Sequence, residues 1–221
     1  MGGIINYLSG KKIIIVCGHY GAGKTNLSVN FALDLKEAGF DCTLVDIDTA
    51  KPYFRGADSA KELRESGVGL IIPPFANTNA DIPAIPAEIY SLFAGKGKRA
   101  VIDVGGDGAG AAVLGMFADK IKRENHEMVY VINKYRYLTG TAEQAADLAG
   151  EIEARSKLKI TSVVNNSNIG GKTTPKDILD SMEYAQKTAD LLHVPLLAAT
   201  SAIDFSSDIV YNIKDCTKKL F

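Results

Sequence analysis

The sequence has few of the features that mark secreted, membrane or nucleic-acid-binding proteins. Its 221 residues include only three cysteines, which are far apart and form neither a CxxC pair nor a zinc-ligand spacing. The formal net charge is −1, so the chain has no general attraction for nucleic acid or acidic lipid. No apolar run approaches the length of a membrane span, and the first residues lack the pattern of a secretory signal. We therefore expect a protein of the reducing cytoplasm, without a nucleic-acid partner and without membrane attachment.

The chain also lacks any feature that would divide it into parts. There is no Gly/Ser linker, charge block or internal repeat, and the length suits one domain spanning residues 1–221. Short β-branched apolar runs such as KIIIVC at 12–17 alternate with segments of helical spacing. This alternation predicts an α/β fold, in which a doubly wound and mostly parallel sheet has helices on both faces.

The expected elements follow from this periodicity and from the turn residues between the runs. Thr141 with Gln144, and Thr174 followed by Pro175, are typical helix starts. A helix at 208–220 carries apolar residues and lysines, and we expect it to pack on the sheet rather than on a membrane. The expected strands are 12–17, 42–47, 68–72, 100–104, 128–132, 160–164 and 196–199, and the expected helices are 26–38, 59–66, 86–93, 109–123, 141–158, 174–192 and 208–220.

The residues from Gly18 to Thr25, GHYGAGKT, match the phosphate-loop pattern G-x-x-x-x-G-K-[ST] between a strand and a helix. Glycines there let backbone N–H groups point at an anion, and the helix N-terminus adds partial positive charge. We expect Lys24 to reach the β- and γ-phosphates of a nucleotide, and Thr25 to place its hydroxyl on Mg²⁺. The residues of this segment expected to bind the nucleotide are Gly18, Gly21, Ala22, Gly23, Lys24, Thr25 and Asn26.

Aspartates stand at the ends of two further expected strands. In an open parallel sheet, ligands bind beyond the carboxyl ends of the strands. Alternation along LVDID places the side chains of Asp46 and Asp48 on the same side of their strand. In the run AVIDVGGD, the apolar strand residues are followed by Asp103, which matches the Walker-B pattern of an aspartate that holds Mg²⁺ directly or through water. These carboxylates are therefore candidates for metal binding and hydrolysis.

With GHYGAGKT, VDIDTAKPYF and VIDVGGD in this order, the sequence resembles the MinD/ParA/CobQ group of P-loop ATPases, a SIMIBI-like class. The resemblance implies a nucleotide-dependent homodimer with ATP and Mg²⁺ at or near the interface, and a protein partner or cargo. It implies that Asp48 positions or activates the attacking water, that Asp46 and Asp103 serve the metal with Thr25, and that Lys24 and Asp48 are catalytic. It also implies that polar strand ends contact adenine, which points to Asn133 and to Asn165 or Asn166, although asparagines at such positions also simply form turns.

The phosphate loop departs from this group at one position. The MinD and ParA branches carry a second lysine near the start of the loop, which reaches the phosphates of the partner subunit, and His19 stands there instead. A neutral imidazole stabilises phosphate far less than a lysine does. Lys51 and Arg55 are alternative sources of positive charge, although a solvated loop is the more ordinary interpretation of both. The run NKYR ends in Arg136 where a guanine-binding NKxD motif has aspartate, and this favours adenine.

Three functions fit these residues. The first is a Mg²⁺-dependent ATPase that acts as a nucleotide switch on a partner or cargo. The second is an ATP-dependent small-molecule enzyme like dethiobiotin synthetase or the cobyrinic-acid amidases. The absent second lysine fits that branch, and a substrate pocket built from residues 73–86 would favour it. The third is a nucleotide-binding module without turnover.

Overall fold

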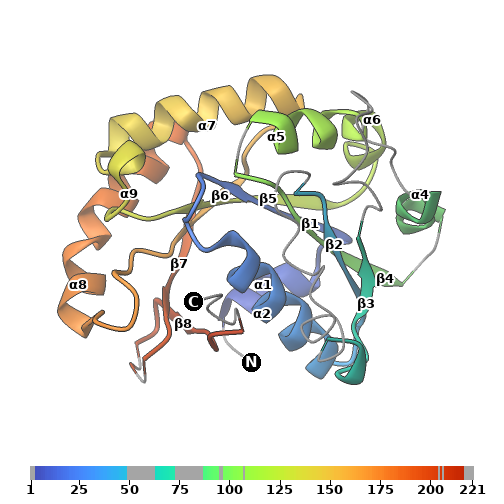
Figure 1. Ribbon diagram of the computed structural model, residues 1–221, viewed down its shortest axis with the longest axis horizontal. Coiled ribbons are helices and arrows are strands. Elements are labelled where there is room, and N and C mark those ends of the chain that lie inside the picture. The colour runs from blue at the N-terminus through green and yellow to red at the C-terminus, as the bar shows by residue number, and fades with distance from the viewer. Residues whose placement is uncertain are drawn as a thin grey trace.

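An eight-stranded parallel sheet forms the centre of the computed structural model (Figure 1). The structure describes residues 3–48, 63–72, 87–94, 97–106, 108–203, 205 and 207–216. Strand order across the sheet is β3-β2-β4-β1-β5-β6-β7-β8, and every pairing is parallel. The strands are β1 (Ile13–Gly18), β2 (Asp41–Asp46), β3 (Gly69–Ile71), β4 (Lys98–Asp103), β5 (His126–Ile132), β6 (Ser162–Asn165), β7 (Leu196–Ser201) and β8 (Val210–Asn212).

Helices cover both faces of this sheet (Figure 1). On one face lie α1 (Gly3–Ser9) and α2 (Lys24–Glu37). On the other, α4 (Ala87–Ala94), α5 (Gly108–Gly115), α6 (Ala118–Ile121), α7 (Ala142–Ser156) and α9 (Met182–Leu192) contribute to one continuous core. The short 3₁₀ turn η2 (Tyr137–Thr139) precedes α7, and α8 (Pro175–Asp180) precedes α9. The predicted fold class, an α/β sheet with helices on both faces, is confirmed.

The central strand β1 shows why the sheet is covered on both sides. Its alternate residues Ile13 and Ile15 pack into the core beneath α7, whereas Ile14 and Val16 pack into the core beneath α2. All four side chains are fully buried. A strand that is apolar on both faces is stable only between two layers of helices, as the run KIIIVC predicts.

Two expected helices are each divided into two. The segment 109–123 forms α5 and α6, and the segment 174–192 forms α8 and α9. At the second break, the buried Ser181 hydroxyl donates to the Ile178 carbonyl at 2.6 Å and accepts from the Asn165 amide at 2.8 Å. A serine that bonds to its own preceding turn competes with the helical hydrogen bonds, so the helix is interrupted there. The predicted capping box at Thr141 and the predicted helix start at Thr174 are confirmed, and Thr174 also forms a capping box with Asp177.

The expected helix at 208–220 is wrong over its described part. Val210–Asn212 forms β8, which pairs in parallel with β7 at the edge of the sheet. Tyr211 packs against Phe31 with ring centroids 5.6 Å apart, and its hydroxyl donates to Asp34 at 2.7 Å. β-branched and aromatic residues favour strands, and pairing with β7 overrides the helical spacing of the apolar residues. The sequence analysis also missed α1, whose Ile4, Ile5 and Leu8 are buried.

Several features of the sequence lie outside the described residues, namely Lys51, Arg55 and the segment 73–86. Within the described ranges, none of the helices combines the length and the apolar character that crossing a bilayer requires.

Candidate functional site

The loop from Gly18 to Thr25 connects β1 to α2 at the carboxyl end of the sheet. Gly18 has a φ of 147°, and a Cβ there would lie 2.3 Å from the carbonyl oxygen of Val131 on the neighbouring β5. Only glycine allows the loop to leave the sheet this close to β5. Lys24 begins α2, where free backbone N–H groups and the helix dipole favour an anion.

A buried asparagine that directly follows β6 holds the back of this loop. The Asn166 amide nitrogen donates to the Ala22 carbonyl at 2.6 Å, and its oxygen accepts a hydrogen bond from the Thr200 hydroxyl. Gly23 has a φ of 89°, and a Cβ on it would lie 2.1 Å from the Asn166 amide nitrogen. Asn166 is 4% exposed, so this contact shapes the loop from beneath it.

The Lys24 side chain lies along the loop and is buried. Its ammonium group donates to the His19 carbonyl at 3.0 Å. A Cβ on Gly106 would lie 2.8 Å from the same ammonium and 2.7 Å from the backbone nitrogen of Tyr20. The segment after β4 thus crosses close to the phosphate loop, which glycine at position 106 allows.

Two carboxylates lie beside each other on neighbouring strands, and one of them contacts the start of α2. The Thr25 hydroxyl donates to one Asp103 oxygen at 2.7 Å, and the Ser28 hydroxyl donates to the other at 3.2 Å. Asp46 on β2 is the register partner of Asp103 on β4 and is fully buried. The predicted residues Thr25, Asp46 and Asp103 therefore lie together.

Burial raises the pKa of the Asp103 carboxyl to about 6, although the hydrogen bond from Thr25 and the charge of Lys24 lower it. The nearby charge of Asp48 adds to the rise. A carboxylate in this setting is stabilised by any cation placed beside it.

Asp48 follows the end of β2, and its backbone N–H donates to Asp46 Oδ1 at 2.9 Å. This bond holds the two aspartates of the VDID run beside each other. The structure thus brings Asp48 to the edge that Lys24, Thr25 and Asp103 share, and its catalytic role stays a prediction.

The oxygen donors gathered here fit Mg²⁺. This ion prefers hydroxyl and carboxylate oxygens, and in phosphate-loop sites it keeps water and phosphate oxygens among its ligands. Within the described residues there is no cluster of three or more His, Cys, Asp or Glu side chains that would hold a metal without a nucleotide. Thr25, Asp46 and Asp103 suit a metal that arrives with phosphate.

The other predicted nucleotide-binding residues have partners within the protein. Asn26 Oδ1 accepts from the Cys216 backbone at 2.8 Å, which ties the segment after β8 to α2. Asn133 Oδ1 accepts from the Tyr135 backbone at 3.0 Å. Asn165 donates to Ser181 and accepts from the Ser167 backbone. Asn133, Asn165 and Asn166 are all buried and shape turns at the carboxyl ends of β5 and β6, so their contact with adenine stays a prediction.

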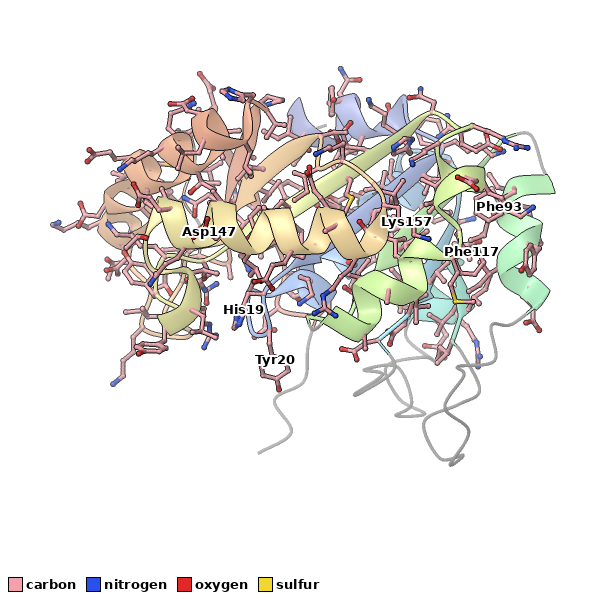
Figure 2. All side chains as sticks on the ribbon, turned by 90° about the horizontal axis from the view of Figure 1, so that it is seen from above. His19, Tyr20, Phe93, Phe117, Asp147 and Lys157 are labelled. Atoms are coloured by element: carbon pink, nitrogen blue, oxygen red, sulfur yellow. The ribbon has the colours of Figure 1, made fainter. Side chains whose placement is uncertain are left out.

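The loop tip carries His19 and Tyr20, which lie next to each other below α7 in the view of Figure 2, where Tyr20 projects outward from the edge of the molecule. The Tyr20 side chain is 62% exposed. His19 Nδ1 lies 2.9 Å from the Tyr20 carbonyl oxygen, so the imidazole folds back on its own loop.

Sequence reasoning missed Ser28, the second hydroxyl on Asp103. Its signal is the spacing from Thr25, because residues three apart share one face of a helix. It also missed Arg136, whose guanidinium lies against Gly21 of the loop.

A parallel sheet with a phosphate loop after its central strand, and with a threonine–aspartate pair beside that loop, defines a P-loop NTPase domain. The model of the CobQ/CobB/MinD/ParA nucleotide binding domain matches residues 13–202, and the chain belongs to this family. The resemblance seen in the motifs is thereby confirmed. No curated protein matches the chain.

Solved structures share the fold. The chloroplast FtsY of Physcomitrella patens has a TM-score of 0.57 at 15% identity, over 93% of this chain and 62% of that one. FtsY from Mycoplasma mycoides has a TM-score of 0.55 at 18% identity, over 86% and 59%. The signal recognition particle 54 kDa protein of Aeropyrum pernix K1, in complex with GDP, has a TM-score of 0.55 at 20% identity, over 86% and 41%. This chain spans about two fifths to three fifths of these proteins, and at such identities the likeness concerns the fold alone.

Proposed function

We propose that the protein is a Mg²⁺-dependent ATPase of the MinD/ParA/CobQ type, which acts as a nucleotide switch on a partner protein or cargo. The observation that carries this proposal is the hydrogen bond from Thr25 to Asp103, with Asp46 alongside and Lys24 in the adjoining loop. A domain that only held a nucleotide by its loop would not need two buried carboxylates at the same point.

Each residue has a role in this proposal. Lys24 neutralises charge on the β- and γ-phosphates, and the loop amides orient them. Thr25, Asp46 and Asp103 hold Mg²⁺, which when bound neutralises charge that develops on the phosphates. Asp48 accepts a hydrogen bond from the attacking water and aligns it with the γ-phosphate. Phosphoryl transfer asks the protein mainly for positioning and charge neutralisation, and these residues supply both.

Family membership supports a switch in which loops beside the γ-phosphate differ between the triphosphate and diphosphate states. Gly105 and Gly106 form the segment that crosses the phosphate loop and would respond in this way. The proposed assembly is a homodimer formed through the nucleotide face, in the cytoplasm.

Adenine is the base that we propose, because Arg136 stands where a guanine-binding motif has aspartate. The GDP in the signal recognition particle protein makes guanine the competing base. Equilibrium titration with ATP and GTP decides between them, and tighter binding of GTP would overturn the choice of adenine.

The experiment that tests the proposal measures nucleotide binding and phosphate release by three purified variants. Lys24→Ala should abolish detectable ATP binding, whereas Asp48→Ala should retain binding within about threefold and lose about 100-fold or more in turnover. Asp41→Ala is the matched control, because Asp41 is an exposed aspartate at the opposite end of β2. Unchanged turnover in Asp48→Ala would rule out the role given to Asp48.

A cavity beside the loop favours a second candidate function, an ATP-dependent small-molecule synthetase or amidase. It is lined in part by Cys17, Gly18, Gly105 and Gly106 and by Glu151 and Arg155 of α7. Its volume of about 40 Å³ leaves room for a group the size of roughly three water molecules, such as a substrate carboxylate.

The dependence of phosphate release on added metabolites distinguishes the two functions. Release of phosphate by the protein alone, or on addition of a protein partner, supports the switch. Release that requires small molecules from a dialysable extract fraction supports the synthetase. If the protein binds ATP but releases no phosphate under any of these conditions, the third function, a nucleotide-binding module without turnover, is supported instead.

A further inference from the structure

The turn that follows β5 is held rigidly beside the phosphate loop. β5 pairs with β1 as far as Gly18, so the carboxyl ends of the two strands are adjacent. In the turn, the Arg136 backbone N–H donates to the Asn133 carbonyl at 3.1 Å, and the Arg136 carbonyl accepts from the Thr139 N–H at 3.1 Å. Asn133 is fully buried and fixes the turn through Tyr135. The backbone of Arg136 therefore has a defined position next to the loop.

The Arg136 side chain lies against the loop itself. A Cβ placed on Gly21 would lie 3.4 Å from Arg136 Cζ and 3.5 Å from its Nε, so the guanidinium lies beside Gly21 at the distance where a side chain there would just touch it. Gly21 has a φ of 74°, in the left-handed region that turns the loop amides toward an anion. The guanidinium is thus within reach of the space that those amides surround.

The charge of Arg136 is not used within the described part of the protein. Across the described residues, the salt bridges include no carboxylate within 4.0 Å of the guanidinium. The neighbouring Lys134 differs, because its ammonium points the other way and donates to the Asp180 carbonyl at the end of α8, at 2.9 Å. Two cations of one short turn therefore have distinct environments, and only one of them faces the loop.

We propose that Arg136 contacts the phosphate groups of the bound nucleotide and supplies, from the same chain, a second positive charge beside that of Lys24. This inference rests on the proposed function, since it takes the loop to bind a nucleotide. Guanidinium has five N–H donors in a planar fork that matches phosphate oxygens, and it remains charged at every physiological pH. Arg136 lies far from the phosphate-loop motif in the sequence. The motif itself has His19 where related ATPases carry lysine.

The test compares Arg136→Ala, Arg136→Lys and the matched control Lys134→Ala in titrations with Mg-ATP, ADP and AMP. Arg136→Ala should weaken ATP binding by roughly 10- to 100-fold, as the loss of a charge-assisted hydrogen bond does, and AMP binding far less. Arg136→Lys should restore part of the loss, because a point charge remains. Lys134→Ala should bind all three within about twofold of the parent. The ATP affinity of Arg136→Ala should also depend less steeply on salt.

Three results would overturn the inference. Equal weakening of ATP and AMP would place Arg136 on the base or sugar, and equal effects of Arg136→Ala and Lys134→Ala would indicate general surface charge. Unchanged ATP affinity in Arg136→Ala would show that Arg136 does not contact the nucleotide. Any of these results leaves the proposed function intact if Lys24→Ala still abolishes nucleotide binding. A parent protein that binds nucleotide but does not hydrolyse it would contradict the proposed ATPase function, and it would leave the proposed Arg136 contact standing. A parent protein that binds no nucleotide contradicts both.

Discussion

At the scale of single residues, two buried carboxylates at opposite ends of the sheet have opposite environments. Asp103 lies at the carboxyl end of β4, and burial raises its pKa. Glu127 lies near the amino end of β5, where Lys11, Tyr7 and Thr161 bind its two oxygens at 2.7 to 2.9 Å. Burial would raise the pKa of Glu127, but the hydrogen bonds from Lys11 and Thr161 outweigh it and hold the pKa below its ordinary value of 4.5. The first setting suits an incoming cation, and the second already contains one.

Glu127→Gln should lower the free energy of unfolding by about 1–3 kcal/mol at pH 7, because charge-assisted hydrogen bonds are lost. The folded-state pKa of Glu127 lies below 4.5, so its contribution is complete above pH 4.5 and disappears as the pH falls through the folded-state pKa. The variant and the parent should therefore converge in acid. Urea unfolding between pH 3 and pH 7 measures both effects.

Glu124→Gln is the control for this prediction. Glu124 pairs with Lys12 at 2.8 Å, but both side chains are partly exposed, and such pairs contribute about 0–1 kcal/mol. A Glu127→Gln variant as stable as Glu124→Gln at neutral pH would contradict the stabilising role of the buried carboxylate.

The sequence identified Lys24, Thr25, Asp46 and Asp103 because each belongs to a short local pattern with a known chemistry. It did not reveal that Asn166 supports Ala22, since that bond joins positions 144 residues apart. A pattern shows which residue types follow one another, whereas the partner of a buried amide depends on strand order.

At the scale of elements, close contact between α5 and α7 depends on small residues. A Cβ on Gly115 of α5 would lie 2.7 Å from the Arg155 carbonyl oxygen at the end of α7. On Gly108, a Cβ would lie 2.6 Å from an Arg155 side-chain nitrogen. The helix that follows the Gly105–Gly106 segment is therefore packed directly on α7, and a movement of one should displace the other.

Gly115→Ala should destabilise the protein by about 1–3 kcal/mol, because the contacted atom is backbone and cannot move aside without shifting a helix. Gly150→Ala is the matched substitution, since Gly150 lies on α7 with nothing within 4 Å of a new Cβ. There alanine should stabilise the helix by about 0.5–1 kcal/mol. Urea midpoints of both variants provide the measurement, and a stabilising Gly115→Ala would contradict the packing described.

The elements themselves were predictable where one periodicity prevailed, as for β1 and α7. The prediction of a helix at 208–220 was wrong, because Ile209, Val210 and Ile213 satisfy a helical spacing but are also residues that favour strands. Pairing with the edge strand β7 is what favours a strand over a helix here. The division of 174–192 was equally hidden, because it depends on Ser181, which donates to the Ile178 carbonyl of the preceding turn and accepts from Asn165 of β6.

At the scale of the whole molecule, the strand order brings the ends of β1, β2, β4 and β5 together at one edge. The sequence predicted parallel strands beneath two helical layers but not their order, and it did not predict the eighth strand. The order of the strands depends on which face of the sheet each connecting helix covers, and no local sequence pattern encodes this choice. The same edge carries the exposed Tyr20, which lies on the face proposed to meet a second copy of the chain.

Tyr20→Arg should weaken nucleotide-dependent dimerisation by about tenfold or more and leave ATP affinity within about threefold, because it removes an aromatic side chain of the kind whose loss commonly costs an interface about 2 kcal/mol or more and places a charge there instead. The measurement is light scattering on a size-exclusion column with ATP, in an Asp48→Ala background that retains the triphosphate. Leu191→Arg, at the end of α9 and 45% exposed, is the control and should dimerise like the parent. A parent that remains monomeric with ATP would contradict the proposed dimer.

The register that aligns Val16, Asp46 and Asp103 across three strands also limits which length changes the chain can tolerate. A single residue inserted within β4 would advance its end by about 3.3 Å and reverse the face on which every later side chain lies. Asp103 would move away from Thr25, and Ile102, the residue before it, would take its place. Single-residue insertions should therefore be compatible with function between the strands. Inside β4 they should abolish function, even where the inserted residue is apolar and the protein still folds.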